Sequence, residues 1–258
     1  MPARDLALLT EAAREAGRIA LRYWRREMQV WDKGGEHGPV TEADLAVNDM
    51  LKARLLAARP DYGWLSEETP DNADRLAVDT VFIIDPIDGT RAFVAGEETY
   101  AHSLAVAHQG KVTAAVVFLP SLDCIYTAST SAPPLKDGQP IAASPRDRLE
   151  GANILTTKQN LLPEKWPGGV PDIQRHFRAS LAYRLCLAAE GRFDGMLTLR
   201  EAWEWDIAAG SLIAERAGAM VSDRRGAALS FNTASAKTDG VLAMPAALHA
   251  DALRRLLG

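Results

Sequence analysis

The first sixty residues contain two segments with helical periodicity. Between residues 5 and 27, apolar side chains recur every three or four positions and five arginines take the other faces, which predicts a long amphipathic helix. The glycine-rich stretch 32–40 predicts a loop. A second helix is predicted from Thr41 to Arg59, because Thr41 and Asp44 have the spacing of a capping box and a proline follows. Two helices are therefore expected before the first strand.

Shorter apolar runs with the periodicity of strands follow. Residues 62–69 predict a short strand, and VFIID at 81–85 is too apolar for a sheet with one face in solvent, so it predicts an interior strand. Residues 103–130 alternate β-rich runs with turn signals, and Asp137-Gly138 is typical of a hairpin turn. This region predicts an antiparallel sheet.

The pattern changes after about residue 144. Strands and helices now alternate, which is typical of an α/β arrangement. The sequence therefore predicts an α/β protein in two parts, an α+β N-terminal part at 1–143 and an α/β C-terminal part at 144–258. The predicted strands are 152–157, 194–199, 219–223 and 240–244, and the predicted helices are 179–191, 205–218 and 245–257.

Composition narrows the class of protein. The 258 residues are 47% hydrophobic and 24% charged, with a net charge of −5, which argues against a nucleic-acid polymer as partner. No apolar run approaches the ~20 residues of a membrane helix, and the N-terminal stretch lacks a signal core. The two cysteines, Cys124 and Cys186, lie in apolar segments and suit a reducing compartment. We expect a cytoplasmic protein without stable membrane insertion.

Acidic residues mark a candidate site at the ends of apolar elements. Asp85 and Asp88 end the run VFIIDPIDGTRAF at 81–93, Glu67 ends an earlier strand, and Asp206 begins a helix. Strand ends are where α/β folds place their sites, and buried carboxylates need a cation beside them. An all-oxygen ligand set favours Mg²⁺ or Mn²⁺. Gly89 admits a close backbone approach, and the following turn could bind phosphate through its N–H groups.

Each of these features has a simpler interpretation when taken alone. The D-x-x-D-G-T motif is equally well a capped turn, Glu67-Glu68 a solvated pair, and Asp44 a helix-capping acid. Trp203 and Trp205 are more commonly core or rim residues than ligand platforms. Only the joint occurrence of these features favours an ion site.

Several other chemistries are excluded by their missing motifs. The chain lacks a nucleophile elbow, a P-loop and a dinucleotide fingerprint, and its five histidines are scattered, which indicates structural or surface roles. Haloacid-dehalogenase-type phosphatases place their two acids two residues apart. Asp85 and Asp88 are three apart, so a covalent aspartyl intermediate is disfavoured.

Five segments resemble the inositol monophosphatase family of Mg²⁺-dependent, lithium-sensitive phosphatases. The resemblance implies a layered αβαβα sandwich of the inositol monophosphatase and fructose-1,6-bisphosphatase type. The segments occur in family order and extend the resemblance from about residue 5 to the C-terminal helix. They are KGGEHGPVTEAD (33–44), GWLSEET (63–69), IDPIDGTRAF (84–93), LAYRLCLAAEG (181–191) and WDIAAG (205–210).

The resemblance implies two or three Mg²⁺ ions, with Mn²⁺ as a substitute and Li⁺ as an inhibitor. Glu67, Asp85 and the main-chain carbonyl of Ile87 would bind the first ion. Asp85, Asp88 and Asp206 would bind the second, and Glu67 would help to hold a third, water-rich ion. Metals of this kind polarise phosphoryl oxygens and make water a better nucleophile.

Catalytic roles also follow from the resemblance. Glu67 belongs to the catalytic set with Thr90 and Asp44, and Thr90, hydrogen-bonded to Asp44, would orient or deprotonate the attacking water. The N–H groups of Gly89 and Thr90 would hold the phosphate. Lys33 matches a lysine in a mobile loop of the family.

The second half of the chain carries the signals for substrate choice. Family members that act on inositol phosphate usually have Gly-Thr or Gly-Ser where this chain has Ala179-Ser180. Arg184 stands where relatives that hydrolyse adenosine 3',5'-bisphosphate carry a basic residue, although a surface arginine is an equal reading. Glu204-Trp205-Asp206 resembles the bacterial 3'(2'),5'-bisphosphate nucleotidases. The predicted substrate contacts are Ile87, Asp88, Gly89, Thr90, Ser180, Arg184 and Asp206.

We therefore predict a phosphoric monoester hydrolase that acts on a small molecule, first of all on the 3'-phosphate of adenosine 3',5'-bisphosphate. Inositol-1-phosphate is the second substrate hypothesis, and histidinol phosphate and fructose 1,6-bisphosphate stay open. A non-catalytic, metal-dependent phosphate-binding regulator is the alternative from another class. The protein is expected to be a monomer or a homodimer.

Overall fold

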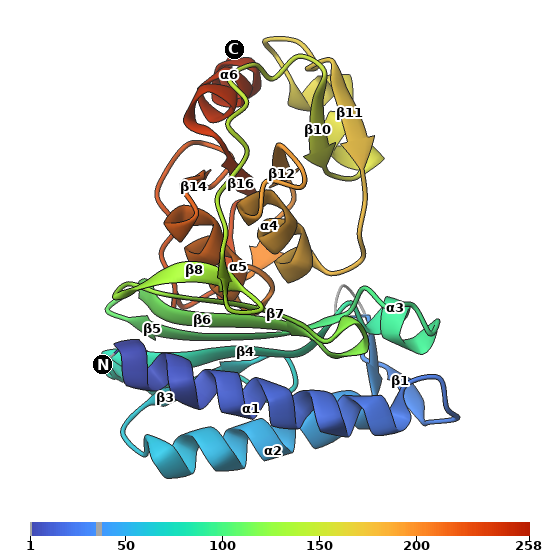
Figure 1. The fold of residues 1–258 in the computed structure, drawn as a ribbon, viewed down its shortest axis with the longest axis vertical. Helices are drawn as coiled ribbons and strands as arrows, with labels where there is room; N and C mark the ends of the chain where they lie inside the picture. The colour runs from blue at the N-terminus through green and yellow to red at the C-terminus, as the bar shows by residue number, and fades with distance from the viewer. Residues whose placement is uncertain (1, 35–37) are drawn as a thin grey trace.

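The computed structural model describes residues 2–34 and 38–258, and its elements stack in five layers (Figure 1). Two helices, a large sheet, two further helices, a smaller sheet and a last helix follow one another through the molecule. This order confirms the predicted αβαβα sandwich. The helices are α1 (Pro2–Tyr23), α2 (Glu42–Ala58), the short α3 (Thr90–Val94), α4 (Leu181–Ala189), α5 (Glu204–Arg216) and α6 (Ala246–Leu257).

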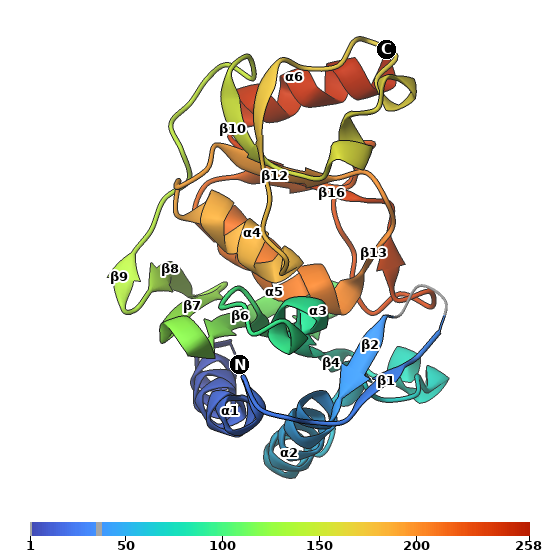
Figure 2. The ribbon, with the colours of Figure 1, turned by 90° about the vertical axis from the view of Figure 1, so that its right-hand side faces the viewer.

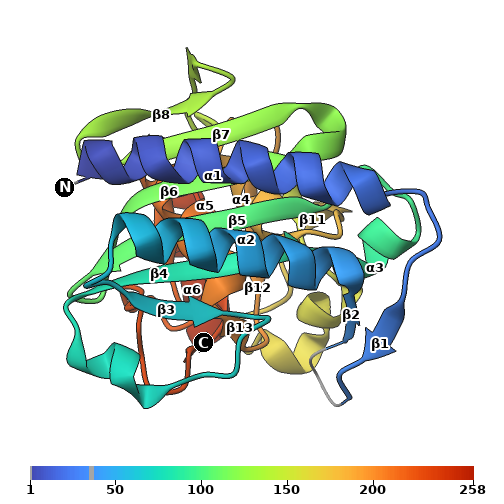
Figure 3. The same cartoon turned by 90° about the horizontal axis from the view of Figure 1, so that it is seen from below.

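The large sheet has the strand order β3-β4-β5-β6-β7-β8-β9. All its pairs are antiparallel except β3 with β4. Helices α1 and α2 lie side by side across one face (Figure 3), and α5 packs on the other. The strands are β3 (Gly63–Ser66), β4 (Thr80–Asp88), β5 (Ala101–His108), β6 (Lys111–Leu119), β7 (Cys124–Ser129), β8 (Ala132–Lys136) and β9 (Gln139–Pro140).

Strand β4 lies between β3 and β5 with nearly every residue buried, as its apolar sequence predicts. The strand is longer than predicted. It continues to Asp88, and its register with β5 shifts between Asp85 and Asp88. A bulge bends a strand and re-aims its side chains. Here the irregular segment brings both aspartates to one end of the strand.

The N-terminal region differs from the prediction at two points. Helix α1 ends at Tyr23, before residue 27, because Arg25 takes a left-handed φ of 57° and its Nε donates to the carbonyl of Gly96. The predicted loop 32–40 is flanked by a hairpin of β1 (Val30–Asp32) and β2 (Pro39–Thr41), and residues 35–37 lie outside the described residues. The capping box of α2 is confirmed, with Thr41 as N-cap.

The smaller sheet has the order β11-β10-β12-β16-β14, with β10, β11 and β12 parallel and β16 antiparallel to both of its neighbours. Helix α6 covers its outer face. A separate two-residue ladder joins β13 to β15. These strands are β10 (Ala152–Leu155), β11 (Ile173–His176), β12 (Gly195–Thr198), β13 (Ala202–Trp203), β14 (Met220–Ser222), β15 (Lys237–Thr238) and β16 (Val241–Met244).

One apolar cluster joins the two sheets through α4 and α5. It includes Ile83 and Tyr126 from the large sheet and Leu185 and Ile213 from the helices. The division at 143/144 into two separate units therefore stays a prediction. Among the described helices, none combines the length and the hydropathy that crossing a membrane requires.

Candidate metal centre and phosphate site

Three aspartates meet where β4 ends and α5 begins. Asp85 and Asp88 come from the bulged end of β4, and Asp206 is the third residue of α5. Each offers a carboxylate oxygen, and these oxygens all lie within 4.8 Å of one another. The structure thus brings Asp206 next to two acids that lie more than a hundred residues earlier in the chain.

The cluster is electrostatically unfavourable without a cation. Burial raises the pKa of Asp85 well above its usual value, and the nearby charges of Glu67, Asp88 and Asp206 raise it further. The pKa of Asp206 is raised well above normal by burial and by Asp88. Asp85 Oδ1 is buried and has no hydrogen-bond partner within residues 2–34 and 38–258. An orphaned carboxylate oxygen among other acids fits a hard divalent cation such as Mg²⁺ or Mn²⁺.

Helix α4 fixes the orientation of Asp88. Ser180 Oγ and the N–H of Ala182 each donate to Asp88 Oδ2 at 2.6 Å. Ser180 is also the N-cap of α4, since its Oγ accepts from the N–H of Tyr183. Burial raises the pKa of Asp88, and the hydrogen bond from Ser180 opposes that rise. Ser180, predicted as a substrate contact, lies against this candidate metal ligand.

The turn after Asp88 requires glycine. Gly89 has a φ of 95°, and a Cβ there would lie 3.4 Å from the main-chain nitrogen of Ser180. A side chain would therefore combine backbone strain with a tight contact against the first turn of α4. Glycine lets the chain enter α3 at Thr90, which confirms the helical turn predicted there.

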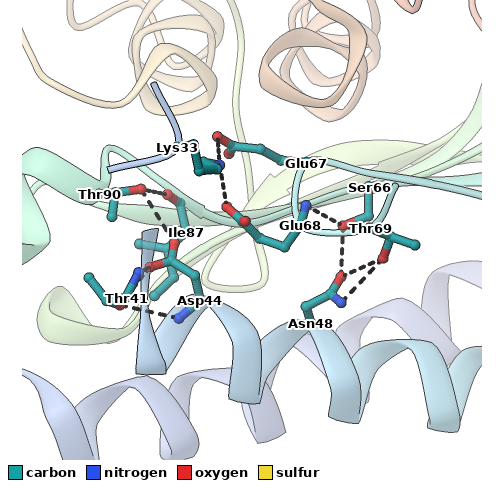
Figure 4. Close-up of polar contacts among 10 residues, drawn as sticks. All are labelled: Lys33, Thr41, Asp44, Asn48, Ser66, Glu67, Glu68, Thr69, Ile87 and Thr90. Atoms are coloured by element: carbon teal, nitrogen blue, oxygen red, sulfur yellow. Dashed lines mark hydrogen bonds and ion pairs between the residues drawn. The ribbon is translucent and has the colours of Figure 1, made fainter. Parts of the chain in front are cut away.

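Thr90 and Asp44 are in contact (Figure 4). Thr90 Oγ1 lies 3.3 Å from Asp44 Oδ1 and 3.1 Å from the carbonyl oxygen of Ile87. Asp44 Oδ2 accepts from both the N–H and the hydroxyl of Thr41, at 2.8 and 2.6 Å. Burial raises the pKa of Asp44 to about 7, and the bonds from Thr41 oppose the rise. Asp44 thus both caps α2 and contacts Thr90.

Glu67 is ion-paired. Lys33 Nζ lies 2.8 Å from Glu67 Oε1 and 2.8 Å from Glu68 Oε1 (Figure 4). Burial raises the pKa of Glu67 to about 7, against the lowering effect of Lys33. Burial alone would lower the pKa of Lys33, but the two glutamates raise it overall. The reading of Glu67-Glu68 as a solvated pair is wrong, because their side chains are only 15% and 3% exposed.

His102 lies behind the turn between the two aspartates of β4. Its Nδ1 is hydrogen-bonded to the carbonyl oxygen of Pro86, and the ring is fully buried. Burial lowers its pKa to about 4, so the ring is neutral at physiological pH. The structural role expected for the histidines holds at this position.

Two cavities meet at the acid cluster. One, of about 420 Å³, is lined by Asp85, Asp88, Gly89, Thr90, Arg91 and Phe177, among others. The second, of about 440 Å³, is lined by Arg200, Glu201, Trp203, Trp205 and Lys237. Glu67 and Asp206 line both cavities. A ligand at the cluster therefore has space on two sides.

Comparison with known proteins agrees with this geometry. The model of the inositol monophosphatase family matches residues 2–256. The chain belongs to the inositol monophosphatase family. Members of this family are phosphatases that generally use Mg²⁺, and the Asp85, Asp88 and Asp206 cluster can bind such an ion.

Relatives with different activities in their names are similar to this chain. A histidinol-phosphatase of Chlorobaculum parvum is 31% identical over 220 residues, with 83% of each chain covered. An inositol-1-monophosphatase of Rhizobium meliloti is 35% identical over 193 residues, with 69% of each covered. The crystal structure of the extragenic suppressor protein suhB from Bartonella henselae superposes with a TM-score of 0.83 at 27% identity, covering 98% of both chains.

Arg184 is buried at the start of α4. It is 7% exposed, so the reading as a surface arginine is wrong. Its Nε donates to the carbonyl of Arg178 at 2.5 Å and its terminal nitrogen to that of Ala179 at 3.2 Å, while the guanidinium lies over the ring of Phe177. Burial lowers its pKa to about 10. A contact between Arg184 and substrate stays a prediction.

Glu204, the first residue of the E-W-D motif, binds the segment around residue 232. Its carboxylate accepts hydrogen bonds from the N–H groups of Asn232 and Thr233 and from the hydroxyl of Thr233. Arg75 reaches the same segment through Asn232 Oδ1. Glu204, which directly precedes Trp205 and Asp206 in the chain, therefore ties the start of α5 to the segment around residue 232.

Sequence reasoning missed three residues of the second cavity. Arg200 and Lys237 belong to no motif, and Trp203 reads as a core or rim residue. The structure places all three in the cavity that Glu67 and Asp206 share. The signal that could have drawn attention to this cavity is the pair of tryptophans two positions apart, next to the candidate ligand Asp206.

Proposed function

We propose that this phosphatase removes the 3'-phosphate of adenosine 3',5'-bisphosphate, giving AMP and inorganic phosphate, with Mg²⁺ as cofactor. The observation that carries the hydrolytic part is the cluster of three acids, two of them buried, beside a glycine turn and the Thr90–Asp44 hydrogen bond. The nucleotidase part is supported by Ala179-Ser180 in place of Gly-Thr and by the E-W-D sequence.

The proposed metal ligands are Glu67, Asp85, the carbonyl of Ile87, Asp88 and Asp206. Bound there, Mg²⁺ would supply Lewis-acid stabilisation of the phosphoryl oxygens. Ser180 and the N–H of Ala182 hold Asp88 Oδ2, so the carboxylate keeps one orientation. Removal of a group that hydrogen-bonds to a metal ligand typically lowers metal affinity or activity by about 10–100-fold.

The remaining residues position the ester and the water. N–H groups of Gly89 and Thr90 hold the phosphate, at a turn that glycine keeps open. Thr90 Oγ1 accepts a hydrogen bond from the attacking water and passes its own proton towards Asp44 Oδ1. The pKa of about 7 that burial gives Asp44 suits a group that takes up a proton near neutral pH. Water displaces the ester oxygen at phosphorus, without a covalent intermediate.

A second candidate, inositol-1-phosphate or histidinol phosphate, is favoured by the names of the similar relatives. All three esters present a phosphate to the same acids and the same turn. They differ in the leaving group, which a cavity beside the cluster has to accommodate.

The test is release of inorganic phosphate with Mg²⁺ from adenosine 3',5'-bisphosphate, inositol-1-phosphate and histidinol phosphate. We expect the highest kcat/KM for the bisphosphate and loss of activity in excess chelator, with recovery on Mn²⁺. A large preference for inositol-1-phosphate would replace the substrate assignment. Full activity in chelator would contradict the metal-dependent mechanism, and no hydrolysis of any ester would favour a non-catalytic phosphate-binding protein.

A further inference from the structure

The cavity beside Trp203 holds two cationic side chains that the proposed mechanism does not use. Arg200 and Lys237 line this space of about 440 Å³ together with Glu67 and Asp206, which belong to the candidate metal centre. A volume of this size is within the range of small-ligand sites. A group attached to a phosphate at the acid cluster would therefore have both cations within the same cavity.

Lys237 is fixed in place by strand register. The two-residue ladder of β13 and β15 pairs Trp203 with Lys237 directly (Figure 2 shows β13 next to α5). Lys237 Nζ consequently lies 4.3 Å from the centroid of the Trp203 ring. The Trp203 ring in turn is stacked on Trp205, with centroids 4.6 Å apart and planes 9° from parallel. The stacked tryptophans thus hold the Lys237 ammonium group at the edge of the cavity.

Arg200 lines the same cavity, with an exposed side chain whose Nη1 is 3.5 Å from the carbonyl oxygen of Glu201. The carboxylate of Glu201 accepts from Lys237 Nζ at 3.3 Å on the exposed rim. Glu201 is therefore a competitor of any anion that binds Lys237.

Arg184 contrasts with these two cations. Its guanidinium donates to two main-chain carbonyls behind α4 and lies 4.4 Å over the ring of Phe177. Binding an anion there would require Arg184 to give up these buried contacts. Arg200 and Lys237 already line a cavity that opens onto the acid cluster.

We propose that Arg200 and Lys237 bind a second phosphate carried by the leaving group of the substrate, and that they determine specificity for bisphosphorylated esters. The proposal rests on the proposed phosphatase function of the acid cluster. Divalent cations would neutralise Glu67 and Asp206, so that Arg200 and Lys237 dominate the charge of the cavity. An anionic leaving group is then attracted, and a cationic one such as an alkylammonium is repelled.

A matched pair of substrates isolates the second phosphate. Adenosine 3',5'-bisphosphate and 3'-AMP share the reacting group and differ only in the 5'-phosphate. We expect wild-type protein to prefer the bisphosphate in kcat/KM. Arg200→Gln and Lys237→Gln should each lower the ratio of the two kcat/KM values by about 10-fold or more, because a hydrogen bond to a charged group contributes roughly 1.5–3 kcal/mol.

Two further variants give matched controls. Arg225→Gln removes an exposed arginine that pairs with Asp239 outside the cavity, and should leave the ratio unchanged. Glu201→Gln removes the competing carboxylate from Lys237 and should raise the ratio. Arg200 and Glu201 are exposed neighbours in the chain. A fall in the ratio for Arg200→Gln together with a rise for Glu201→Gln would be difficult to attribute to altered folding.

Binding of AMP provides a readout that does not depend on turnover. AMP retains the 5'-phosphate, so calorimetry should show tighter binding of AMP than of adenosine, and Arg200→Gln and Lys237→Gln should abolish most of that difference. Calorimetry therefore decides the inference even if phosphate release from every ester fails and the proposed function falls.

The competing assignment predicts the reverse pattern. If Arg184→Gln lowers the ratio selectively while Arg200→Gln and Lys237→Gln leave it unchanged, the inference is overturned and the proposed function stands. Equal affinity of the wild-type protein for AMP and adenosine would also overturn it.

Discussion

The two sides of Asp206 are built in different ways. On one side, Asp85 and Asp88 are buried at the end of an interior strand, and Ser180 holds one of their oxygens at 2.6 Å. On the other side, Lys237 and Trp203 face each other across a ladder of two residues at the rim of a cavity. The first side is buried, whereas on the second side the tryptophans pack against the core and the charged residues Arg200 and Lys237 lie outside it.

We interpret this difference as a division of roles, in which the buried acids cleave the ester and the residues at the rim select the leaving group. Cleavage of a phosphate ester needs carboxylates at fixed positions, which burial and backbone hydrogen bonds provide. In our proposal, recognition of the leaving group needs only charges of the right sign near the cluster, which Arg200 supplies from a loop and Lys237 from a two-residue strand. Family members can therefore share one reaction while their names record different substrates.

The largest effect is expected from Asp85→Asn on the buried side. Activity should fall by about 10³-fold, since one preorganised charge at a reacting centre contributes this much. In chelator the variant should be more stable than wild type, because one of several mutually repelling carboxylates is removed. The rise in Tm on adding Mg²⁺ should disappear. Asp123→Asn, at an exposed carboxylate, is the control and should keep the wild-type response. A wild-type rise in Tm with Mg²⁺ in Asp85→Asn would contradict a metal-binding role of Asp85.

His102 predicts a pH dependence of stability on the same side. Its folded pKa of about 4 lies below the ordinary 6.5, so the unfolded chain binds a proton first as pH falls. The stabilising contribution of the neutral ring is complete above pH 6.5 and is lost as pH falls towards 4, by up to about 3 kcal/mol. Urea unfolding of wild type and His102→Gln at pH 7 and pH 5 measures the difference. Parallel losses in both proteins would contradict this assignment.

Glu204→Gln tests the hydrogen bonds that tie the start of α5 to the segment around residue 232. The amide nitrogen would face a main-chain N–H where the carboxylate now accepts hydrogen bonds, which should cost about 1–3 kcal/mol of unfolding free energy. The concentration of Mg²⁺ needed for half-maximal activity should also rise, because Asp206 follows two residues later. Glu164→Gln, on an exposed short helix, serves for comparison. A change in stability without a change in Mg²⁺ response would limit Glu204 to folding.

The smallest effect is expected from Ser180→Ala. Loss of the N-cap of α4 should cost about 1 kcal/mol, measured by urea unfolding. Mg²⁺ affinity should weaken as well, since Asp88 loses a hydrogen-bond donor. Ser180→Thr keeps the hydroxyl and should restore both properties. Weak Mg²⁺ binding in Ser180→Thr would show that the hydroxyl is not what orients Asp88.

The same contrast explains what the sequence could predict. Asp85, Asp88 and Gly89 are neighbours in the chain, and Thr41 and Asp44 form a local capping box, so short patterns were sufficient to predict the start of α2 and a candidate acid site. The layered fold was predicted from the family resemblance. The buried interior strand was equally visible, because it is apolar on both faces.

The features that the sequence did not predict depend on contacts between distant segments. Trp203 meets Lys237 only because a ladder pairs two segments 34 residues apart, and no local pattern encodes that register. Lys33 follows β1 and pairs with Glu67, 34 residues further along the chain, a contact that no local pattern encodes. Arg184 is a charged residue that is buried in the fold, and its sequence neighbours do not indicate this burial.

The central claim is that the aspartates at the end of β4 and the start of α5 hold divalent cations. Anomalous diffraction from crystals grown with Mn²⁺ tests it directly. We predict strong peaks in ligating contact with Asp85, Asp88 and Asp206, and their loss in Asp85→Asn. Mn²⁺ peaks at other carboxylates with none at this cluster would contradict the account.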